Sequence, residues 1–292
     1  MKKQFISGIC LIASLFTLNA CGPKKQKTAN GLEYEIHTKG EGRQSEMGDI
    51  IKGKLVLSTD KGDTLFSVDE SLPILKIQQS IYPGDLNEGL LALSEGDSAS
   101  FYVPADSLKK YMGGLPAEID EFMVYSVKID RLYTEEELEA EQKAEEAAAL
   151  EKEKTAIARY LEDNDIKVKP EESGIYFIST KKGSGKTIAQ GQAVKVNYIG
   201  KLLNGKLFDT NIESVAKENN VYNPQRPYEP MEVPAGVGQM IPGFDEALLK
   251  MKKGGKATVI IPFAQAYGSR DMGPDIPAYS TLVFDIEIVD AE

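Results

Sequence analysis

Residues 193–203 have the sequence AVKVNYIGKLL, and residues 257–262 and 281–289 have the sequences ATVIIP and TLVFDIEIV. These stretches are rich in branched and aromatic residues and alternate in places, a pattern typical of strands. Residues 242–252, PGFDEALLKMK, instead place Phe244, Leu248 and Met251 on one face of a short helix. Together they predict an α+β fold, in which one short helix packs on an antiparallel sheet.

One pattern of residue types occurs twice along the chain. Lys39, Gly40, Gly42, Gly48 and Lys52 recur 143 positions later as Lys182, Gly183, Gly185, Gly191 and Lys195. Leu90, Leu91, Gly96, Ala99 and Pro104 recur 158 positions later as Leu248, Leu249, Gly254, Ala257 and Pro262. Collinear matches of this length are hard to obtain by chance, so the sequence predicts two diverged copies of one domain.

A charged stretch lies between the two copies. Thr134 and Glu137 form a capping box, and the Glu, Lys and Ala residues that follow favour a long helix. Up to Lys152 this helix has almost no apolar stripe and is predicted to be a solvated spacer, whereas Ile157 and its neighbours give its end a docking face. Thirty helical residues span about 45 Å, so the helix could hold the two copies apart.

The chain begins with a basic start and an apolar centre, the layout of a secretory signal. Residues 18–21, LNAC, resemble the lipobox of bacterial lipoproteins, which implies that Cys21 is the lipidated mature N-terminus. The alternatives are a plain secretory signal or a membrane helix, for which the apolar run is short. The expected location is the cell envelope, with the protein anchored by lipid to a bacterial membrane, the outer membrane or periplasm being preferred.

Composition limits the chemistry that the chain can perform. The net charge of −11 argues against a nucleic-acid partner, because phosphate backbones attract basic surfaces. The one histidine, His37, lies in a predicted strand, and no cluster of Cys, His or carboxylate residues has the spacing of metal ligands, so no metal site is expected. Residues 183–187, GSGKT, imitate a phosphate-binding loop, but Thr180 stands where that loop needs glycine; a turn is predicted instead.

Several motifs follow one another in the second copy. They are Val196-Asn197-Tyr198-x-Gly200, Gly205-Lys206-Leu207-Phe208-Asp209, Gly238-Gln239-Met240-Ile241-Pro242-Gly243-Phe244, Ala266-Tyr267-Gly268, Ile276-Pro277 and Thr281-Leu282-Val283-Phe284-Asp285. In this order they resemble the FKBP-type peptidyl-prolyl cis-trans isomerases over nearly all of residues 174–289. The resemblance implies two FKBP-like domains, each a curved antiparallel sheet wrapped on a short helix, joined by the long charged helix.

The resemblance also implies an apolar pocket for a proline ring and no cofactor. The catalytic positions it implies are Tyr198, Phe208, Asp209, Ile241, Tyr267 and Phe284, and the substrate-binding positions are Met240, Phe244, Ile276 and Met231. Any single aromatic residue could instead be ordinary core packing, and Asp209 alone could equally hold a turn or a cap.

The second copy departs from the family pattern at three points. Phe244 stands where many members have tryptophan, Met231 occupies a position that is often aromatic, and residues 211–230 are longer than usual and contain Tyr222 and Tyr228. These departures bear on the binding of the family's inhibitors more than on isomerase activity.

The first copy matches the pocket pattern poorly. Phe66 is assigned to one pocket position and Tyr125 to that of Phe284, but Leu55 falls at the Tyr198 position and Ser67 replaces Asp209. The first copy is therefore interpreted as a non-catalytic relative that binds polypeptide, pairs with another chain or spaces the enzyme from the membrane.

The predicted organisation follows from these observations. It comprises a signal peptide at 1–20, a lipid-anchored tether at 21–30, a diverged FKBP-like domain at 31–133, a helical linker at 134–171 and an isomerase domain at 172–292. The leading hypothesis is an isomerase that acts on X-Pro bonds of exported polypeptide clients and assists their folding. The alternative is a non-catalytic chaperone or scaffold that binds apolar segments. The sequence also leaves open whether two chains pair through the spacer helix as a homodimer.

Overall fold

The computed structural model describes residues 24–68, 73–112 and 119–291; the predicted signal peptide and lipidated Cys21 lie outside these ranges. The chain forms two compact units, a first unit up to Glu141 and a second unit from Gln142 onward. Within the described ranges, no helix combines the length and the apolar character that crossing a membrane requires. The predicted domain boundaries stay predictions.

The first unit is built on an antiparallel sheet of seven strands. Its strands are β1 (Gln26–Lys27), β2 (Glu33–Thr38), β3 (Ile50–Thr59), β4 (Thr64–Val68), β5 (Pro73–Lys76), β6 (Ser98–Pro104) and β7 (Phe122–Tyr133). Its short helices are α1 (Leu86–Leu90) and α2 (Ala105–Met112). The prediction of a tether at residues 21–30 is wrong for its second half. Strand β1 pairs with β2, and Asn30 bonds to Glu88, so these residues belong to the folded first unit.

The second unit is built on an antiparallel sheet of six strands. These are β8 (Tyr176–Lys181), β10 (Ala193–Leu202), β11 (Leu207–Thr210), β12 (Met231–Pro234), β14 (Lys256–Ile261) and β15 (Leu282–Ala291). Two helices, α4 (Glu213–Glu218) and α5 (Pro242–Lys250), and the 3₁₀ helix η1 (Phe263–Gln265) complete it. The predicted turn at residues 183–187 is wrong, because Ser184–Thr187 form strand β9, which pairs with β13 (Lys252–Lys253).

The two sheets share one strand order. In the first unit it is β2-β6-β7-β3-β4 with β5 beside β3, and in the second it is β8-β14-β15-β10-β11 with β12 beside β10. The strands correspond one to one in chain order as well. Duplication of one domain would produce two such sheets, which have the same strand order and the same additional strand paired at the same place.

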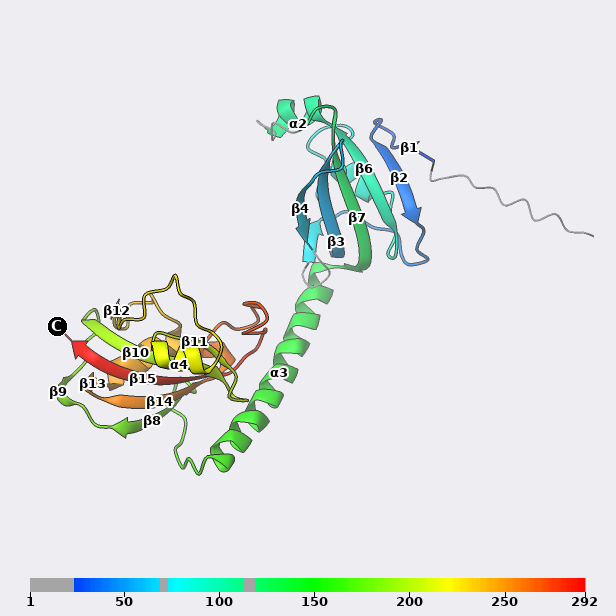
Figure 1. The fold of residues 1–292 in the computed structure, drawn as a ribbon. Helices are drawn as coiled ribbons and strands as arrows, with labels where there is room; N and C mark the ends of the chain where they lie inside the picture. The colour runs from blue at the N-terminus through cyan, green and yellow to red at the C-terminus, as the bar shows by residue number, and fades with distance from the viewer. Residues whose placement is uncertain (1–23, 69–72, 113–118, 292) are drawn as a thin grey trace, which may run out of the picture. The chain divides into compact units, whose positions relative to one another are not determined.

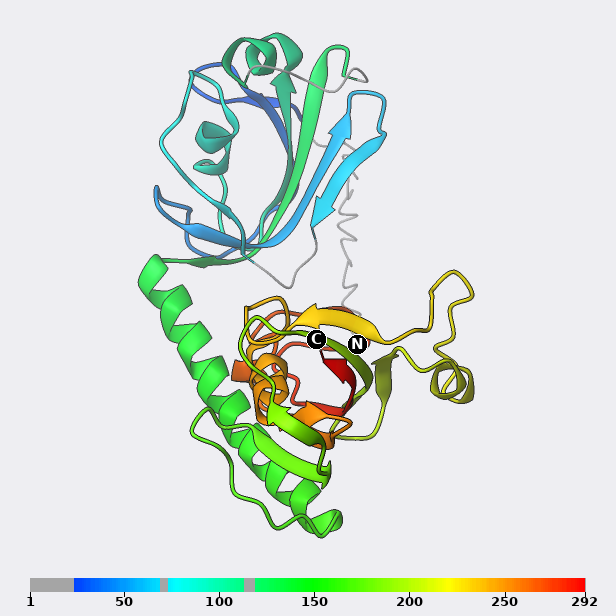
Figure 2. The same ribbon diagram turned by 90° about the vertical axis from the view of Figure 1, so that its left-hand side faces the viewer.

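In each unit the sheet curves around a short helix (Figure 2). The hydrophobic core of each unit includes residues of both its sheet and its helix. In the second unit, Phe244 and Leu248 of α5 are fully buried against strand residues such as Val196 and Ile286. The core of the first unit includes Leu90 of α1 and Phe101 of β6. The predicted α+β class with antiparallel sheets is confirmed, and the three long strands and the helix fall within two residues of their predicted ends.

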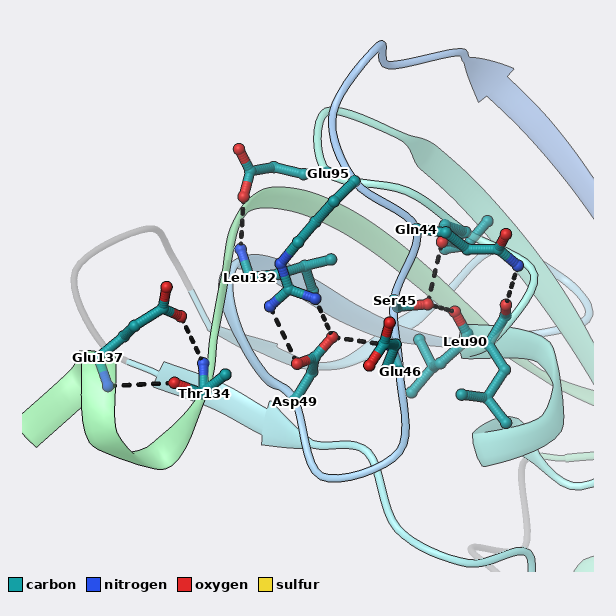
Figure 3. A network of polar contacts seen from close by, with 12 residues as sticks. Gln44, Ser45, Glu46, Asp49, Leu90, Glu95, Leu132, Thr134 and Glu137 are labelled. Carbon is teal, nitrogen blue, oxygen red and sulfur yellow. Dashed lines mark hydrogen bonds and ion pairs between the residues drawn. The ribbon is translucent and has the colours of Figure 1, made fainter.

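The predicted long charged helix is also confirmed as α3 (Glu135–Asp163), which follows β7 directly (Figure 1). Its capping box forms as expected: the Thr134 backbone N–H donates to Glu137 Oε2 at 2.8 Å, and the Glu137 N–H donates to Thr134 Oγ1 at 3.2 Å (Figure 3). At its start, Glu141 bonds to Tyr133 and Arg131 of the first unit. Further along, Ile157 packs on Ile260 and Val283 of the second unit.

Candidate active site

Four aromatic rings from four elements of the second unit meet at one place. We call Tyr198 of β10, Phe208 of β11, Phe244 of α5 and Phe284 of β15 the aromatic cluster. The Phe284 ring lies at its centre, with centroid distances of 5.1 Å to Phe244, 5.6 Å to Phe208 and 6.2 Å to Tyr198. Edge-to-face pairs at such distances are favourable beyond the area they bury. Phe244 is fully buried, whereas Phe208 is half-buried.

The other predicted apolar residues lie against the same core. All are half-buried side chains packed on it: Met231, Met240, Ile241, Tyr267 and Ile276. They come from β12, the start of α5 and the segment between η1 and β15. Although these residues lie far apart in the sequence, the fold brings them around the aromatic cluster, where their exposed parts offer an apolar surface to a ligand.

A polar trio lies beside the aromatic cluster. The Tyr198 hydroxyl donates to Asp209 Oδ2 at 2.6 Å. Arg226 donates through Nη1 to Asp209 Oδ1 and through Nη2 to the Tyr198 oxygen, the latter at 2.8 Å. Because a guanidinium offers a rigid fork of donors, Arg226 fixes the carboxylate and the phenol together.

The hairpin of β10 and β11 places this trio. Gly200 pairs with Asp209 in its ladder, so Tyr198 and Asp209 project close together. Buried Asn211 then fastens the long segment after β11, because its amide donates to the carbonyls of Val196 and Glu229 at 2.8 and 3.0 Å. Arg226 lies near the end of that segment, and its side chain reaches back to Asp209.

Sequence reasoning missed Arg226. Residues 211–230 are longer than usual and contain Tyr222 and Tyr228, whose rings stack at 5.4 Å. The path of a long loop cannot be predicted from hydrophobic periodicity. The sequence offers one hint only: residues 211–230, which follow the motif residue Asp209, contain a single arginine, Arg226. The sequence left three roles open for Asp209: a site residue, a turn residue or a helix cap. In the structure its carboxylate bonds to the side chains of Tyr198 and Arg226, and it caps no helix of the described residues.

The environment keeps Tyr198 protonated and Arg226 charged. Burial and the hydrogen bond to Asp209 raise the pKa of Tyr198 to about 12, against an opposing effect of Arg226. The hydrogen bond to Asp209 raises the pKa of Arg226 despite some desolvation. The phenol is therefore a hydrogen-bond donor at neutral pH.

A free backbone donor lies next to the aromatic cluster. Ile241 precedes α5, and its carbonyl accepts the N–H groups of Phe244 and Asp245. Among the described residues, none accepts a hydrogen bond from the Ile241 N–H. An N–H group at a helix start is well suited to bind a carbonyl oxygen.

The corresponding place in the first unit is built differently. In its ladders Tyr125 lies opposite Leu57 and Phe101, as Phe284 lies opposite Gly200 and Val259, which agrees with the predicted match of Tyr125 to Phe284. Phe66, however, lies opposite Leu57 as Asp209 lies opposite Gly200.

The prediction that Ser67 replaces Asp209 is therefore wrong by one residue, because short strand β4 left its register undetermined. Phe66 stands in place of the carboxylate and not in place of Phe208, and its side chain is 50% exposed. With Leu55 in place of Tyr198, the first unit has neither the phenol nor the carboxylate of the polar trio.

The described residues contain no group of His, Cys, Asp and Glu that could hold a metal ion. His37 is exposed on β2 and bonds to Ser100 at 2.8 Å, which is a structural contact.

Comparison with known proteins identifies the second unit. Residues 184–289 match the model of the FKBP-type peptidyl-prolyl cis-trans isomerase family. A short-type peptidyl-prolyl cis-trans isomerase of Methanocaldococcus jannaschii is 49% identical over 84 residues, which are 29% of this chain and 53% of that protein. An FK506-binding protein of Neisseria meningitidis is 36% identical over 107 residues, which are 37% of this chain and 86% of that protein.

The crystal structure of FkpA from Escherichia coli matches with 29% identity and a TM-score of 0.37, over 55% of this chain and 74% of that one. The chain spans 21%, 53% and 58% of three of the curated relatives that it matches. The Neisseria protein, by contrast, is matched over most of its length at more than a third identity. The chain therefore belongs to the FKBP-type peptidyl-prolyl cis-trans isomerase family.

Proposed function

We propose that the second unit catalyses cis-trans isomerisation of X-Pro bonds in polypeptide clients. The observation that supports this most is the aromatic cluster with the polar trio at its side. Family membership and the order of the motifs support it as well. No cofactor is needed, because the reaction breaks no bond.

Rotation of the X-Pro amide is slow because resonance is lost when the bond twists, with a barrier of roughly 18–20 kcal/mol. The twisted amide has less charge separation than the planar one. An apolar surface of Phe208, Phe244 and Phe284 disfavours the planar form more than the twisted form, which lowers the barrier. Each 1.36 kcal/mol of such selective stabilisation accelerates exchange about tenfold.

The polar groups have separate tasks. The Ile241 N–H and the Tyr267 hydroxyl hold the client carbonyl, while Met231, Met240 and Ile276 contact the proline ring and its neighbours. Asp209 orients the Tyr198 hydroxyl and is itself oriented by Arg226. Arg226 is thus a positioning residue in this scheme.

The experiment is cis-to-trans exchange of a short X-Pro peptide with the full chain, beside Tyr267→Phe and Asp209→Asn. Tyr176→Phe, a half-buried tyrosine packed near α3, is the matched control. Acceleration by the full chain that falls in the two site variants and not in the control supports the proposal. A folded chain that does not accelerate exchange would contradict it.

We further propose that the protein acts in the bacterial cell envelope, anchored by lipid at Cys21, on exported polypeptides. Its signal-like N-terminus and the LNAC motif support this. The first unit is proposed to bind polypeptide without catalysis, because Phe66 and Leu55 stand in place of Asp209 and Tyr198. Metabolic labelling with a fatty acid, with Cys21→Ser as control, tests the anchor; sedimentation of the full chain tests the predicted pairing of two chains.

A further inference from the structure

A buried carboxylate lies on α3, one residue beyond the stretch that was predicted to be solvated, which ends at Lys152. Glu153 of α3 is 7% exposed, whereas its neighbours Lys152 and Lys154 are exposed. Burial of a carboxylate is unfavourable unless hydrogen bonds compensate for the lost water. Here Glu153 Oε1 accepts the Phe263 backbone N–H at 2.7 Å and the Thr281 hydroxyl at 2.5 Å.

The two donors lie at the two ends of one segment. Phe263 begins η1, and Thr281 is the residue before β15. The residues between them, which we call segment 263–281, include Tyr267 and Ile276, both of which pack beside the aromatic cluster. One carboxylate oxygen of α3 therefore holds together both ends of the segment that supplies two site residues.

The segment needs such support because its backbone is strained. Tyr279 has a φ of +58°, a left-handed conformation that is unfavourable for an aromatic residue. Its N–H donates to the Gly268 carbonyl at 2.9 Å, and its ring lies edge-on to Phe263 at 5.3 Å. The Gly268 N–H in turn donates to the Phe263 carbonyl at 2.9 Å. Strain of this kind persists only where surrounding contacts enforce it.

Packing along α3 does not replace the contact made by Glu153. An open groove of about 620 Å³ lies between part of the helix and the segment. Small side chains, Ala148, Ala149 and Ala156, line it on the helix side, and Tyr279 and Ser280 line it on the other. The apolar contact of Ile157 is with Ile260 and Val283, on the neighbouring strands.

We propose that Glu153 is a positioning residue of the isomerase site, and that helix α3 is part of the active unit. Its carboxylate holds segment 263–281 in the conformation that presents Tyr267 and Ile276 to the client. This inference rests on the proposed isomerase function. It assigns a role in client binding to the helix between the units, and it implies that a fragment lacking α3 binds clients more weakly than the full chain.

The test compares variants of the full chain in peptide exchange, with kcat and KM measured separately. Glu153→Ala removes the acceptor, and Glu153→Gln keeps an oxygen that can accept both donors. Thr281→Val removes one donor. Glu146→Ala is the control, because Glu146 is an exposed glutamate on the same helix.

We expect Glu153→Ala to lower kcat/KM about three- to tenfold, mainly through a higher KM, because misplaced Tyr267 and Ile276 weaken binding of the client. Glu153→Gln should recover most of the loss, and Glu146→Ala should match the parent chain. Since Glu153 and Thr281 share one interaction, the double variant should be no worse than Glu153→Ala alone. A purely structural role would lower the melting temperature without this change in KM.

Amide resonances of Tyr267, Gly268 and Ile276 give a second readout that does not depend on activity. They should shift in Glu153→Ala and Thr281→Val and stay in place in Glu146→Ala. An active parent chain whose Glu153→Ala variant keeps both KM and these resonances would overturn the inference and leave the isomerase proposal intact. An inactive parent chain would refute the isomerase proposal, while the resonances would still decide whether Glu153 holds the segment. If Glu153→Ala does not fold, Thr281→Val provides both readouts.

Discussion

Arg226 is held by two partners and in turn fixes both of them. Its side chain and that of Asp209 are 37% and 39% exposed, so water weakens their ion pair well below the strength of a buried one. Arg226→Met should therefore cost about 1 kcal/mol of transition-state stabilisation, which is about a fivefold fall in kcat/KM. Exchange of an X-Pro peptide measures it.

The matched control is Arg159→Met, since Arg159 is an exposed arginine on α3 that pairs only with nearby Asp163 in the described contacts. It should leave kcat/KM unchanged. Equal effects of the two substitutions would mean that Arg226 acts through general charge and does not orient Asp209.

Gly200 leaves room for two rings of the aromatic cluster. A Cβ at this position would lie 2.7 Å from the Phe208 ring and 2.9 Å from the Phe284 ring. Gly200→Ala must therefore displace both rings, and such overpacking costs typically about 1–3 kcal/mol of stability. Because the displaced rings belong to the site, kcat/KM should fall about tenfold as well.

Gly89→Ala gives the control for this clash. Its Cβ would lie 2.5 Å from the ring of Phe101, in the core of the first unit. It should destabilise the protein to a similar extent without changing kcat/KM. If Gly200→Ala keeps full activity, the placement of Phe208 and Phe284 at the reacting bond is wrong.

At the scale of elements, helix α1 is fastened to neighbouring loops by the carboxylate of Glu88, and the charge of this carboxylate depends on pH. Glu88 accepts both Asn30 donors and the Gly84 N–H, each at 2.9 Å. Desolvation opposes its ionisation, but these hydrogen bonds prevail and lower the pKa of Glu88 from 4.5 to about 2. A folded-state pKa below the unfolded one means that the ionised group stabilises the fold.

This stabilisation is complete above about pH 4.5 and is lost as the pH falls toward 2. Urea unfolding of the parent chain and of Glu88→Gln should therefore differ at pH 7 and converge near pH 2. Glu146→Gln, at an exposed position of α3, should show no such pH dependence. A difference that stays constant from pH 7 to pH 2 would show that the hydrogen bonds do not depend on the charge of Glu88.

The elements also show where sequence reasoning succeeds. Strands β10, β14 and β15 and helix α5 were predictable because their apolar patterns run over several residues, and the capping box of α3 because it is local. Strand β9 was missed because Ser184–Thr187, three polar residues and a glycine, have no apolar periodicity and pair only with β13.

In the site too, residues marked by a sequence pattern were predicted, and residues placed by distant contacts were not. The apolar residues could be assigned from motif order, and the structure places all of them on one core. Arg226 and Glu153 were missed because each reaches its partners through tertiary contacts: Arg226 is 17 residues from Asp209, and Glu153 is 110 from Phe263. No local pattern marks a charged residue as buried or paired when its partners lie that far away in the sequence.

At the scale of the whole molecule, each unit has a main hydrophobic core of its own among the described residues. The core of the first unit is made from β2, β3, β6, β7 and α1, and that of the second from β10, β14, β15 and α5. Each is formed by residues of its own unit, so each unit has its own source of stability. Two unfolding transitions are therefore expected in calorimetry, and they should respond to different substitutions.

Phe101→Ala tests this independence. Phe101 is fully buried in the first core and stacks on Tyr34 at 5.7 Å, so its loss should destabilise the first unit by about 3–5 kcal/mol. One calorimetric transition should move to lower temperature while the other stays, and X-Pro exchange at 25 °C should keep its rate because the aromatic cluster lies in the second unit. Phe244→Ala should move the other transition and abolish the activity, since Phe244 contacts both Tyr198 and Phe284. If both transitions moved together in Phe101→Ala, the two cores would unfold as one cooperative unit, and the first unit would have to be counted among the elements that support the site.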